Sequence, residues 1–140
     1  MMTASNMAEI VRHQNPLTVG PGATIQEACA AMHKRRVGAV LVIDKGKLAG
    51  IFTGRDAVHA LATGLDPQRT LVGQVMTRDC CTLRAHHHAI DALRLMDNGG
   101  FRHLPIVEDG KVLGIVSRYD FRAEDHRRMD EETGFFEILR

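Results

Sequence analysis

Apolar positions along the chain follow two spacings, one typical of helices and one typical of buried strands. Just after residue 24, apolar side chains recur at i, i+3, i+4 and i+7, which places them on a single helical face. These side chains are Ile25, Ala28, Cys29 and Met32. A short extended segment is predicted before this helix, at residues 17–19. The apolar run at residues 39–43 predicts a buried strand, and residues 48–53 predict a second one.

The same pattern occurs a second time further along the chain. When the sequence is shifted by 64 residues, the interval from Thr18 to Thr82, it aligns on itself without a gap. The matched pairs include Ala28 with Ala92, Met32 with Met96, Gly50 with Gly114, Ile51 with Ile115 and Asp56 with Asp120. In the second copy the extended segment falls at residues 81–83 and the strands at 104–107 and 112–117, and the helix face is Ala89, Ala92, Leu93 and Met96. Chance would not hold this register over a helix and two strands, so we infer an internal duplication.

Capping and turn residues divide each copy into elements. Thr24 with Glu27 forms a capping-box pattern at the first helix. Residues 44–47 and 108–111 each contain a glycine and predict hairpin turns. We expect Asp56 and Asp120 to be the N-caps of a second helix in each copy. The first of these helices is expected to end at Gly64, ahead of Asp66-Pro67.

Each copy is therefore predicted to be a β-α-β-β-α unit, which gives an α+β fold. A unit of this size is too small to be robust alone, because small domains bury too little of their surface. We expect the two units to share a core, packed with pseudo-two-fold symmetry.

Composition narrows the classes of function. The 140 residues are 44% hydrophobic and 25% charged, as in ordinary globular proteins. Lys and Arg number 18 against 17 Asp and Glu, a net charge of +1 that disfavours charge-driven binding of a nucleic acid duplex. No apolar run approaches the roughly 20 residues of a membrane span, and residues 1–13 do not resemble a signal peptide. Three cysteines without a framework spacing predict a cytoplasmic location.

Two strings in the duplicated pattern resemble a known signature. GIFTGRD at residues 50–56 and GIVSRYD at residues 114–120 are similar to the glycine–hydrophobic–x–Thr/Ser–x–x–Asp motif of CBS (cystathionine-β-synthase) domains. FRHLPIV at 101–107 and QVMT at 74–77 resemble further segments of that family. Two such repeats form a Bateman module. The resemblance covers about residues 8–125, with repeat 1 at 8–64, repeat 2 at 72–125 and a C-terminal tail at 126–140.

The resemblance implies a regulatory module and not an enzyme. CBS pairs commonly bind adenosine nucleotides in clefts between the repeats, so AMP, ADP, ATP or NAD is the expected ligand, with no catalytic cofactor. A standalone pair is expected to form a homodimer and to signal to a separate, unknown protein. The alternative is a dimerisation scaffold without a ligand. An enzyme would need a nucleophile–base pair or an HExxH motif, and the sequence displays neither.

The duplicated motif also supplies chemistry suited to a nucleotide. One carboxylate can accept hydrogen bonds from both hydroxyls of a ribose, and Asp56 and Asp120 are the candidates. Thr53 and Ser117 stand three residues earlier, where a hydroxyl can bond a ribose or phosphate oxygen. The alternative is structural: the two acids cap helices, and the two hydroxyls satisfy the strand ends.

Cationic side chains near the two acids are candidates for binding phosphate. Arg55 and Arg118 flank the acids, and Arg102 and His103 precede a predicted strand. By the family pattern Arg55 serves the Asp120 site, and Arg102 and His103 serve either site. The first copy has Gly38 and Ala39 in place of Arg102 and His103, and Tyr119 replaces Arg55. We therefore expect the cleft at Ser117 and Asp120 to be the better equipped.

Three further segments contain unusual clusters of histidine, basic or apolar residues, and none of them changes this hypothesis. Residues 86–88 are three consecutive histidines, whose side chains diverge, so a solvated loop is favoured over a metal site. The basic run at residues 34–36 is interpreted as a solvated helix end. The apolar residues 135–139 are expected to pack on the body of the protein or across a dimer interface, and a disordered tail is the alternative.

Overall fold

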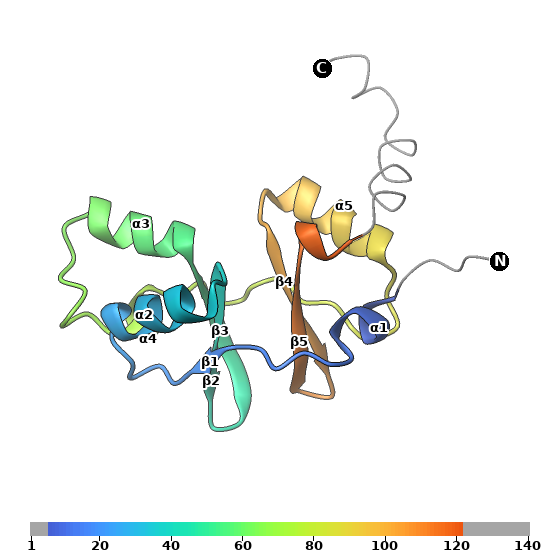
Figure 1. Ribbon diagram of the computed structural model, residues 1–140, viewed down its shortest axis with the longest axis horizontal. Helices are drawn as coiled ribbons and strands as arrows, with labels where there is room; N and C mark the ends of the chain where they lie inside the picture. Colours follow the sequence, from blue (N-terminus) through green and yellow to red (C-terminus); the bar gives the residue numbers. More distant parts are fainter. Residues whose placement is uncertain (1–5, 122–140) are drawn as a thin grey trace, which may run out of the picture. The chain divides into compact units, whose positions relative to one another are not determined.

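The structure is a computed structural model that describes residues 6–121 (Figure 1). The chain divides into two compact units. The repeat-1 unit contains residues 15–81 and 109–112, and the described part of the repeat-2 unit contains residues 6–14, 82–108 and 113–121. No helix in this range is both long enough and apolar enough to cross a membrane.

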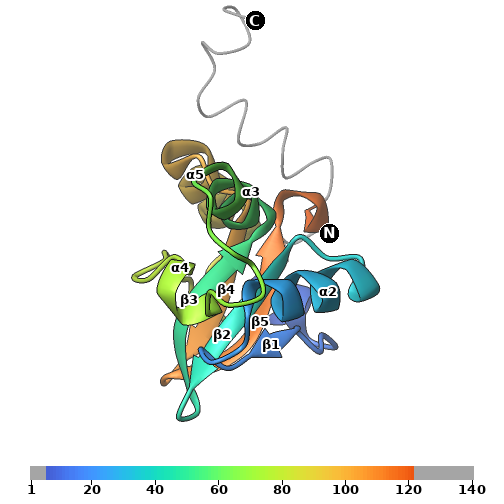
Figure 2. The same ribbon diagram turned by 90° about the vertical axis from the view of Figure 1, so that its left-hand side faces the viewer.

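The repeat-1 unit is a three-stranded sheet with helices on one side (Figures 1 and 2). Its elements are β1 (Thr18–Val19), α2 (Ile25–Arg35), β2 (Ala39–Asp44), β3 (Lys47–Thr53), α3 (Gly54–Ala62) and α4 (Val72–Val75). The strand order is β1-β2-β3, with β1 parallel to β2 and β2 antiparallel to β3. The mixed helix and strand content of the predicted α+β unit is confirmed.

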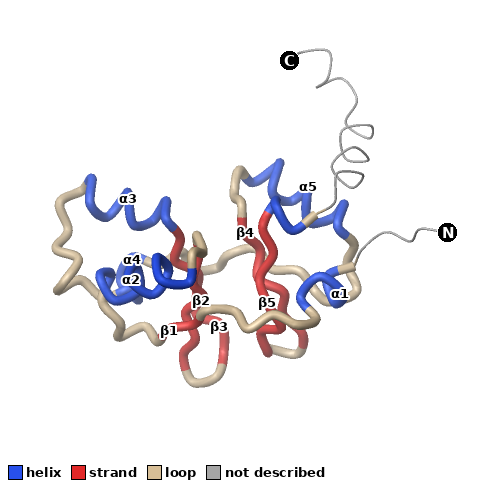
Figure 3. Tube along the Cα trace, viewed as in Figure 1, coloured by secondary structure: helices blue, strands red, loops and turns tan. Residues whose placement is uncertain are grey.

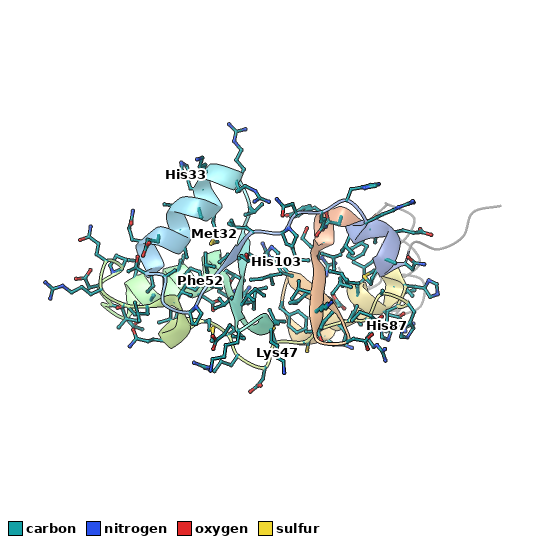
Figure 4. All side chains as sticks on the ribbon, turned by 90° about the horizontal axis from the view of Figure 1, so that it is seen from below. Met32, His33, Lys47, Phe52, His87 and His103 are labelled. Carbon is teal, nitrogen blue, oxygen red and sulfur yellow. The ribbon has the colours of Figure 1, made fainter. Side chains whose placement is uncertain are left out.

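The core of the repeat-1 unit lies between its helices and the strands. Ile25, Ala28 and Met32 are buried, so the predicted apolar face of α2 is confirmed there. They pack in one cluster with Phe52 of β3, and Figure 4 shows Met32 and Phe52 between helix and sheet. Cys29 is only half-buried at the edge of this cluster, and burial raises the pKa of its thiol.

The repeat-2 unit is built on a two-stranded sheet. Its elements are α1 (Met7–Val11), α5 (Ala89–Gly99), β4 (His103–Glu108), β5 (Lys111–Ser117), which belongs to this unit from Leu113 onward, and the 3-10 turn η1 (Arg118–Asp120). The predicted helix face is confirmed in full, because all four of its residues are buried. They are Ala89, Ala92, Leu93 and Met96.

The extended segment predicted at residues 81–83 pairs with the sheet at Leu83 alone. It is reduced to a single parallel bridge between Leu83 and Ile106. In the first copy the N–H of Leu41 donates to the carbonyl of Leu17 at 3.0 Å. The equivalent donor in the second copy would be Pro105, which has no N–H. The ladder therefore cannot extend toward Cys81.

The two short helices that open the copies are exchanged between the units. Helix α1 precedes copy one but belongs to the repeat-2 unit, where the N–H of Met7 donates to the carbonyl of His87 at 2.9 Å. Helix α4 precedes copy two but belongs to the repeat-1 unit, where its Val72 joins the buried core cluster.

This exchange explains the glycine of the duplicated motif. A Cβ on Gly50 would lie 2.6 Å from the carbonyl oxygen of Thr77, just beyond α4. A Cβ on Gly114 would lie 2.7 Å from the Cβ of Val11 in α1. Only glycine lets each opening segment cross its strand this closely.

Both predicted hairpin turns are confirmed (Figure 3). Lys45 and Gly46 have φ of 52° and 78°, and Asp109 and Gly110 have 51° and 79°. Positive φ at both central positions is the conformation whose twist matches that of the flanking strands. The turns therefore set the same hairpin in each copy.

The prediction that Asp56 and Asp120 are N-caps is wrong. Thr53 is the N-cap of α3, and Ser117 is the N-cap of η1. Each aspartate stands at the third position and completes a capping box. Helix α3 ends at Ala62 ahead of Gly64, whose φ is +83°, as predicted. A second helix in copy two and the apolar residues 135–139 lie outside the described residues.

Candidate functional site

In the repeat-1 unit, Thr53 and Asp56 meet where β3 passes into α3. The N–H and the hydroxyl of Thr53 both donate to Oδ2 of Asp56, at 2.9 and 3.1 Å. The N–H of Asp56 points back to Oγ1 of Thr53 at 3.3 Å. This reciprocal box fixes the half-buried carboxylate at the start of the helix.

A third residue, Thr77, bonds the same carboxylate. Its hydroxyl donates to Oδ1 of Asp56 at 3.2 Å. The main chain of Thr77 is bridged to Ile51 of β3 by two hydrogen bonds of 2.8 and 3.0 Å. Both oxygens of Asp56 are therefore engaged by groups of the repeat-1 unit. Thr77 was missed at the sequence level, because nothing in the periodicity links it to a residue 21 positions earlier.

In the repeat-2 unit, Ser117 and Asp120 occupy the equivalent positions. The N–H of Ser117 donates to Oδ2 of Asp120 at 2.6 Å, and Oγ of Ser117 accepts from the N–H of Tyr119 at 3.3 Å. Within residues 6–121 this is the one hydrogen bond that the Asp120 carboxylate accepts, and its side chain is exposed. Asp120 thus keeps acceptor capacity that Asp56 has given to its own unit.

His103 adds a titratable group to this end of the sheet. It opens β4, and burial lowers the pKa of its imidazole. The negative charge of Asp120 opposes that shift, and the positive charge of Arg102 reinforces it. In the first copy the position equivalent to His103 is Ala39, which pairs with Thr53. The two units are therefore unequal in chemistry, as predicted.

The remaining predicted site residues are cations at element boundaries. Arg55 is exposed in the first turn of α3, and Arg118 is half-buried in η1. Arg102 is exposed immediately before β4. The structure thus brings Thr53 together with Asp56. In the other unit it places Ser117 beside Asp120, whose negative charge acts on His103.

The histidine tract forms a turn ahead of α5. Nδ1 of His87 accepts a hydrogen bond from the N–H of Arg84 at 3.2 Å. The rings of His87 and His86 are stacked, with their centroids 4.3 Å apart. Figure 4 labels His87 among the side chains. Among residues 6–121 no three or more His, Cys, Asp or Glu side chains are grouped so that they could hold a metal ion.

The basic run at residues 34–36 ends α2. All three side chains are exposed, in agreement with a solvated helix end. Arg35 donates to the main-chain carbonyl of Asn15, which ties the end of the helix to the segment before β1. Arg36 adopts the left-handed conformation, with φ of 55°.

A family model described as the CBS domain matches residues 7–63 and again residues 72–127. This chain belongs to the CBS domain family. The match covers both copies of the internal duplication, so the two CBS repeats inferred from the sequence are confirmed.

Curated relatives carry the same CBS repeats. The CBS domain-containing protein YhcV of Bacillus subtilis is 39% identical over 104 residues, which are 74% of each protein. The CBS domain-containing protein CBSCBSPB2 of Arabidopsis thaliana is 44% identical over 108 residues, which are 76% of this chain and 20% of the plant protein. The chain spans about a fifth of the length of the plant relatives that it matches.

Solved CBS structures share the fold. The CBS domain pair of protein MJ0100, in complex with 5-methylthioadenosine and S-adenosyl-L-methionine, has a TM-score of 0.75 at 25% identity and covers 94% of this chain and 99% of its own. The CBS domain protein PAE2072 from Pyrobaculum aerophilum, complexed with AMP, has a TM-score of 0.81 and covers 90% of this chain and 98% of its own. Its 20% identity supports a shared fold alone.

Proposed function

We propose that this CBS pair is a regulatory module that binds an adenosine nucleotide and signals to a separate protein. The observation that carries the proposal is the exposed carboxylate of Asp120, which accepts one hydrogen bond among residues 6–121 and lies within the electrostatic reach of His103. The complex of the MJ0100 pair with two adenosine derivatives supports this class of ligand.

In the repeat-2 unit, one set of side chains would bind the sugar of the ligand and another set its phosphate. Asp120 would accept hydrogen bonds from the ribose hydroxyls, and Ser117 would bond a neighbouring oxygen. His103, Arg102 and Arg118 would supply donors to phosphate, for which a guanidinium offers two parallel donors. The expected ligands are AMP, ADP, ATP or NAD, and no catalytic cofactor is required.

The repeat-1 unit offers a second, less well equipped set of side chains. Thr53, Arg55 and Asp56 repeat the motif, but Gly38 and Ala39 stand where the other copy has Arg102 and His103. We propose that any ligand bound here depends less on phosphate contacts.

The proposal also covers the oligomeric state and the cellular location of the chain. We propose a cytoplasmic homodimer without catalytic activity, in which residues 8–64 and 72–125 are the repeats and 126–140 a tail. Exposed apolar residues of α3, Val58 and Leu61, are candidates for the contact between copies, since they are 67% and 61% exposed.

Calorimetric titration with AMP, ADP, ATP, NAD and S-adenosylmethionine tests the proposal. We expect one of these ligands to bind, and Asp120→Ala to weaken its affinity by at least tenfold. Asp56→Ala should have the smaller effect. Asp97→Ala is a matched control, because Asp97 is an exposed acid of the same unit on α5.

Melting curves complete the test. Asp120→Ala should cost about 1 kcal/mol of stability, the usual value of a lost cap interaction, so melting curves separate binding loss from unfolding. If none of the five ligands gives heat or raises the melting temperature at millimolar concentration, the dimerisation scaffold without a ligand is favoured instead.

A further inference from the structure

The two aspartates of the duplicated motif have different partners. Asp56 accepts hydrogen bonds from the N–H and hydroxyl of Thr53 at Oδ2, and from the hydroxyl of Thr77 at Oδ1. Asp120 accepts, within the described residues, from the N–H of Ser117 at Oδ2. Within the described residues, the carboxylate at this motif position therefore accepts three protein donors in one unit and one in the other.

The main chain of Thr77, and not only its side-chain rotamer, places its hydroxyl beside Asp56. Its N–H donates to the carbonyl of Ile51 at 2.8 Å, and its carbonyl accepts from the N–H of Ile51 at 3.0 Å. Gly50 permits this approach, since a Cβ there would collide with the Thr77 carbonyl. The backbone thus holds the hydroxyl beside the carboxylate.

The repeat-2 unit has no such hydroxyl at the equivalent place. The residue that aligns with Thr77 is His13, which is exposed. The residue that aligns with Ile51 is Ile115, and its N–H donates to the side-chain oxygen of Gln14 at 2.9 Å. A side-chain amide therefore replaces the main-chain bridge in this unit.

A ribose diol bound by one carboxylate needs acceptor positions on that group. At Asp56, Oδ2 already accepts two donors from the capping box, and Oδ1 accepts the hydroxyl of Thr77. Breaking the capping box would weaken the start of α3. The Thr77 bond is the one that a ribose hydroxyl could replace while the helix start stays intact.

We propose that Thr77 is a specificity-determining residue that occupies, at Asp56, the position a ribose hydroxyl would take. The inference rests on the proposed function, because it concerns where the adenosine ligand binds. As a consequence, one molecule of ligand binds per chain, at Asp120. The Asp56 motif serves to hold the segment after α4 against β3.

The test is a titration with adenosine, which carries the diol without a phosphate, on a chain whose Asp120 site is disabled. We expect Thr77→Val in the Asp120→Ala background to raise the affinity for adenosine about three- to tenfold, the worth of one competing hydrogen bond. Valine keeps the shape of threonine and leaves the main-chain bridge intact. The compound 2′,3′-dideoxyadenosine should gain nothing, because it lacks the diol.

Thr63→Val in the same background is the matched control. Its hydroxyl also lies in the repeat-1 unit, but it donates to the carbonyl of His59 at the end of α3. The inference is overturned if the Thr77 variant binds adenosine no better than its parent, if Thr63→Val gives the same gain, or if the wild type binds two equivalent molecules per chain. If the wild type binds no adenosine compound, the proposed function itself fails, and the inference fails with it.

Discussion

At the scale of single residues, one chemical difference between the two copies is His103, which aligns with Ala39. An imidazole whose pKa is lowered by burial is mostly neutral at neutral pH. Among residues 6–121, the charges of Arg102 and Asp120 act on it with opposite signs. A bound phosphate would add negative charge and favour the protonated ring.

This arrangement predicts a pH dependence of ligand binding. The affinity for AMP should rise by several-fold between pH 8 and pH 6, and by no more than about tenfold per pH unit, because a single proton is taken up. Calorimetry in buffers of different ionisation heat measures the proton uptake. His103→Gln removes the titrating group and should flatten the profile to the contribution of the phosphate alone. An unchanged slope in that variant would contradict the assignment of His103 to phosphate.

The lowered pKa of His103 also makes the stability of the folded unit depend on pH. An unfolded chain titrates this histidine near its ordinary pKa of about 6.5, so the folded unit binds fewer protons just below that value. The contribution of neutral His103 to stability is present above pH 6.5 and is lost as the pH falls toward its folded pKa.

Gly50 gives a second prediction at the residue scale. Gly50→Ala places a Cβ 2.6 Å from the Thr77 carbonyl, and a backbone atom cannot move away as a flexible side chain can. We expect a loss of about 1–3 kcal/mol in the free energy of unfolding. Chemical denaturation measures it, with Gly54→Ala as the control, since a Cβ there meets nothing within 4 Å. Equal stability of the two variants would refute the close crossing.

At the scale of elements, short-range sequence patterns predicted most of the helices and turns of the two units. The apolar faces of α2 and α5 and the two hairpin turns depend on residues a few positions apart, so periodicity and glycine placement were sufficient. The caps were misassigned because a Thr/Ser–x–x–Asp string contains two capping residues. The strand-to-helix passage makes the first of them the N-cap.

Local sequence patterns did not predict two other features of the structure. The bond from Thr77 to Asp56 joins segments brought together by tertiary packing, which no short-range pattern reports. The shortened extended segment at Leu83 follows from Pro105, whose missing N–H was readable in the sequence but concerns a neighbouring strand.

The end of α2 gives a prediction at the element scale. Arg36 holds a left-handed conformation where the second copy has Gly100, which ends α5 in the same way. Arg36→Gly should stabilise the chain by about 0.5–1 kcal/mol, because glycine adopts positive φ without a Cβ penalty. Thermal unfolding measures the change. The reciprocal Gly100→Arg should be destabilising by a similar amount, and a stabilising result there would contradict the argument.

At the scale of the whole molecule, the proposed homodimer has a direct test. Replacing Val58 and Leu61 with Asp would put charge on an exposed apolar face of α3 without touching the buried core. We expect the wild type to be dimeric and the double variant monomeric by light scattering. Val58→Asp alone should weaken the dimer less. A dimer that persists in the double variant would exclude this face.

The exchange of α1 and α4 also fixes an order of events during synthesis. The repeat-1 unit has nearly all of its chain once Cys81 has left the ribosome, because α4 follows closely behind the strand that it crosses. Helix α1 is made before its partners, the His87 carbonyl and β5, which emerge about 80 to 100 residues later. Its apolar residues Met7 and Val11 therefore remain uncovered until β5 has been translated. Contacts so distant in sequence form slowly, so docking of this helix is expected to be among the last steps of folding.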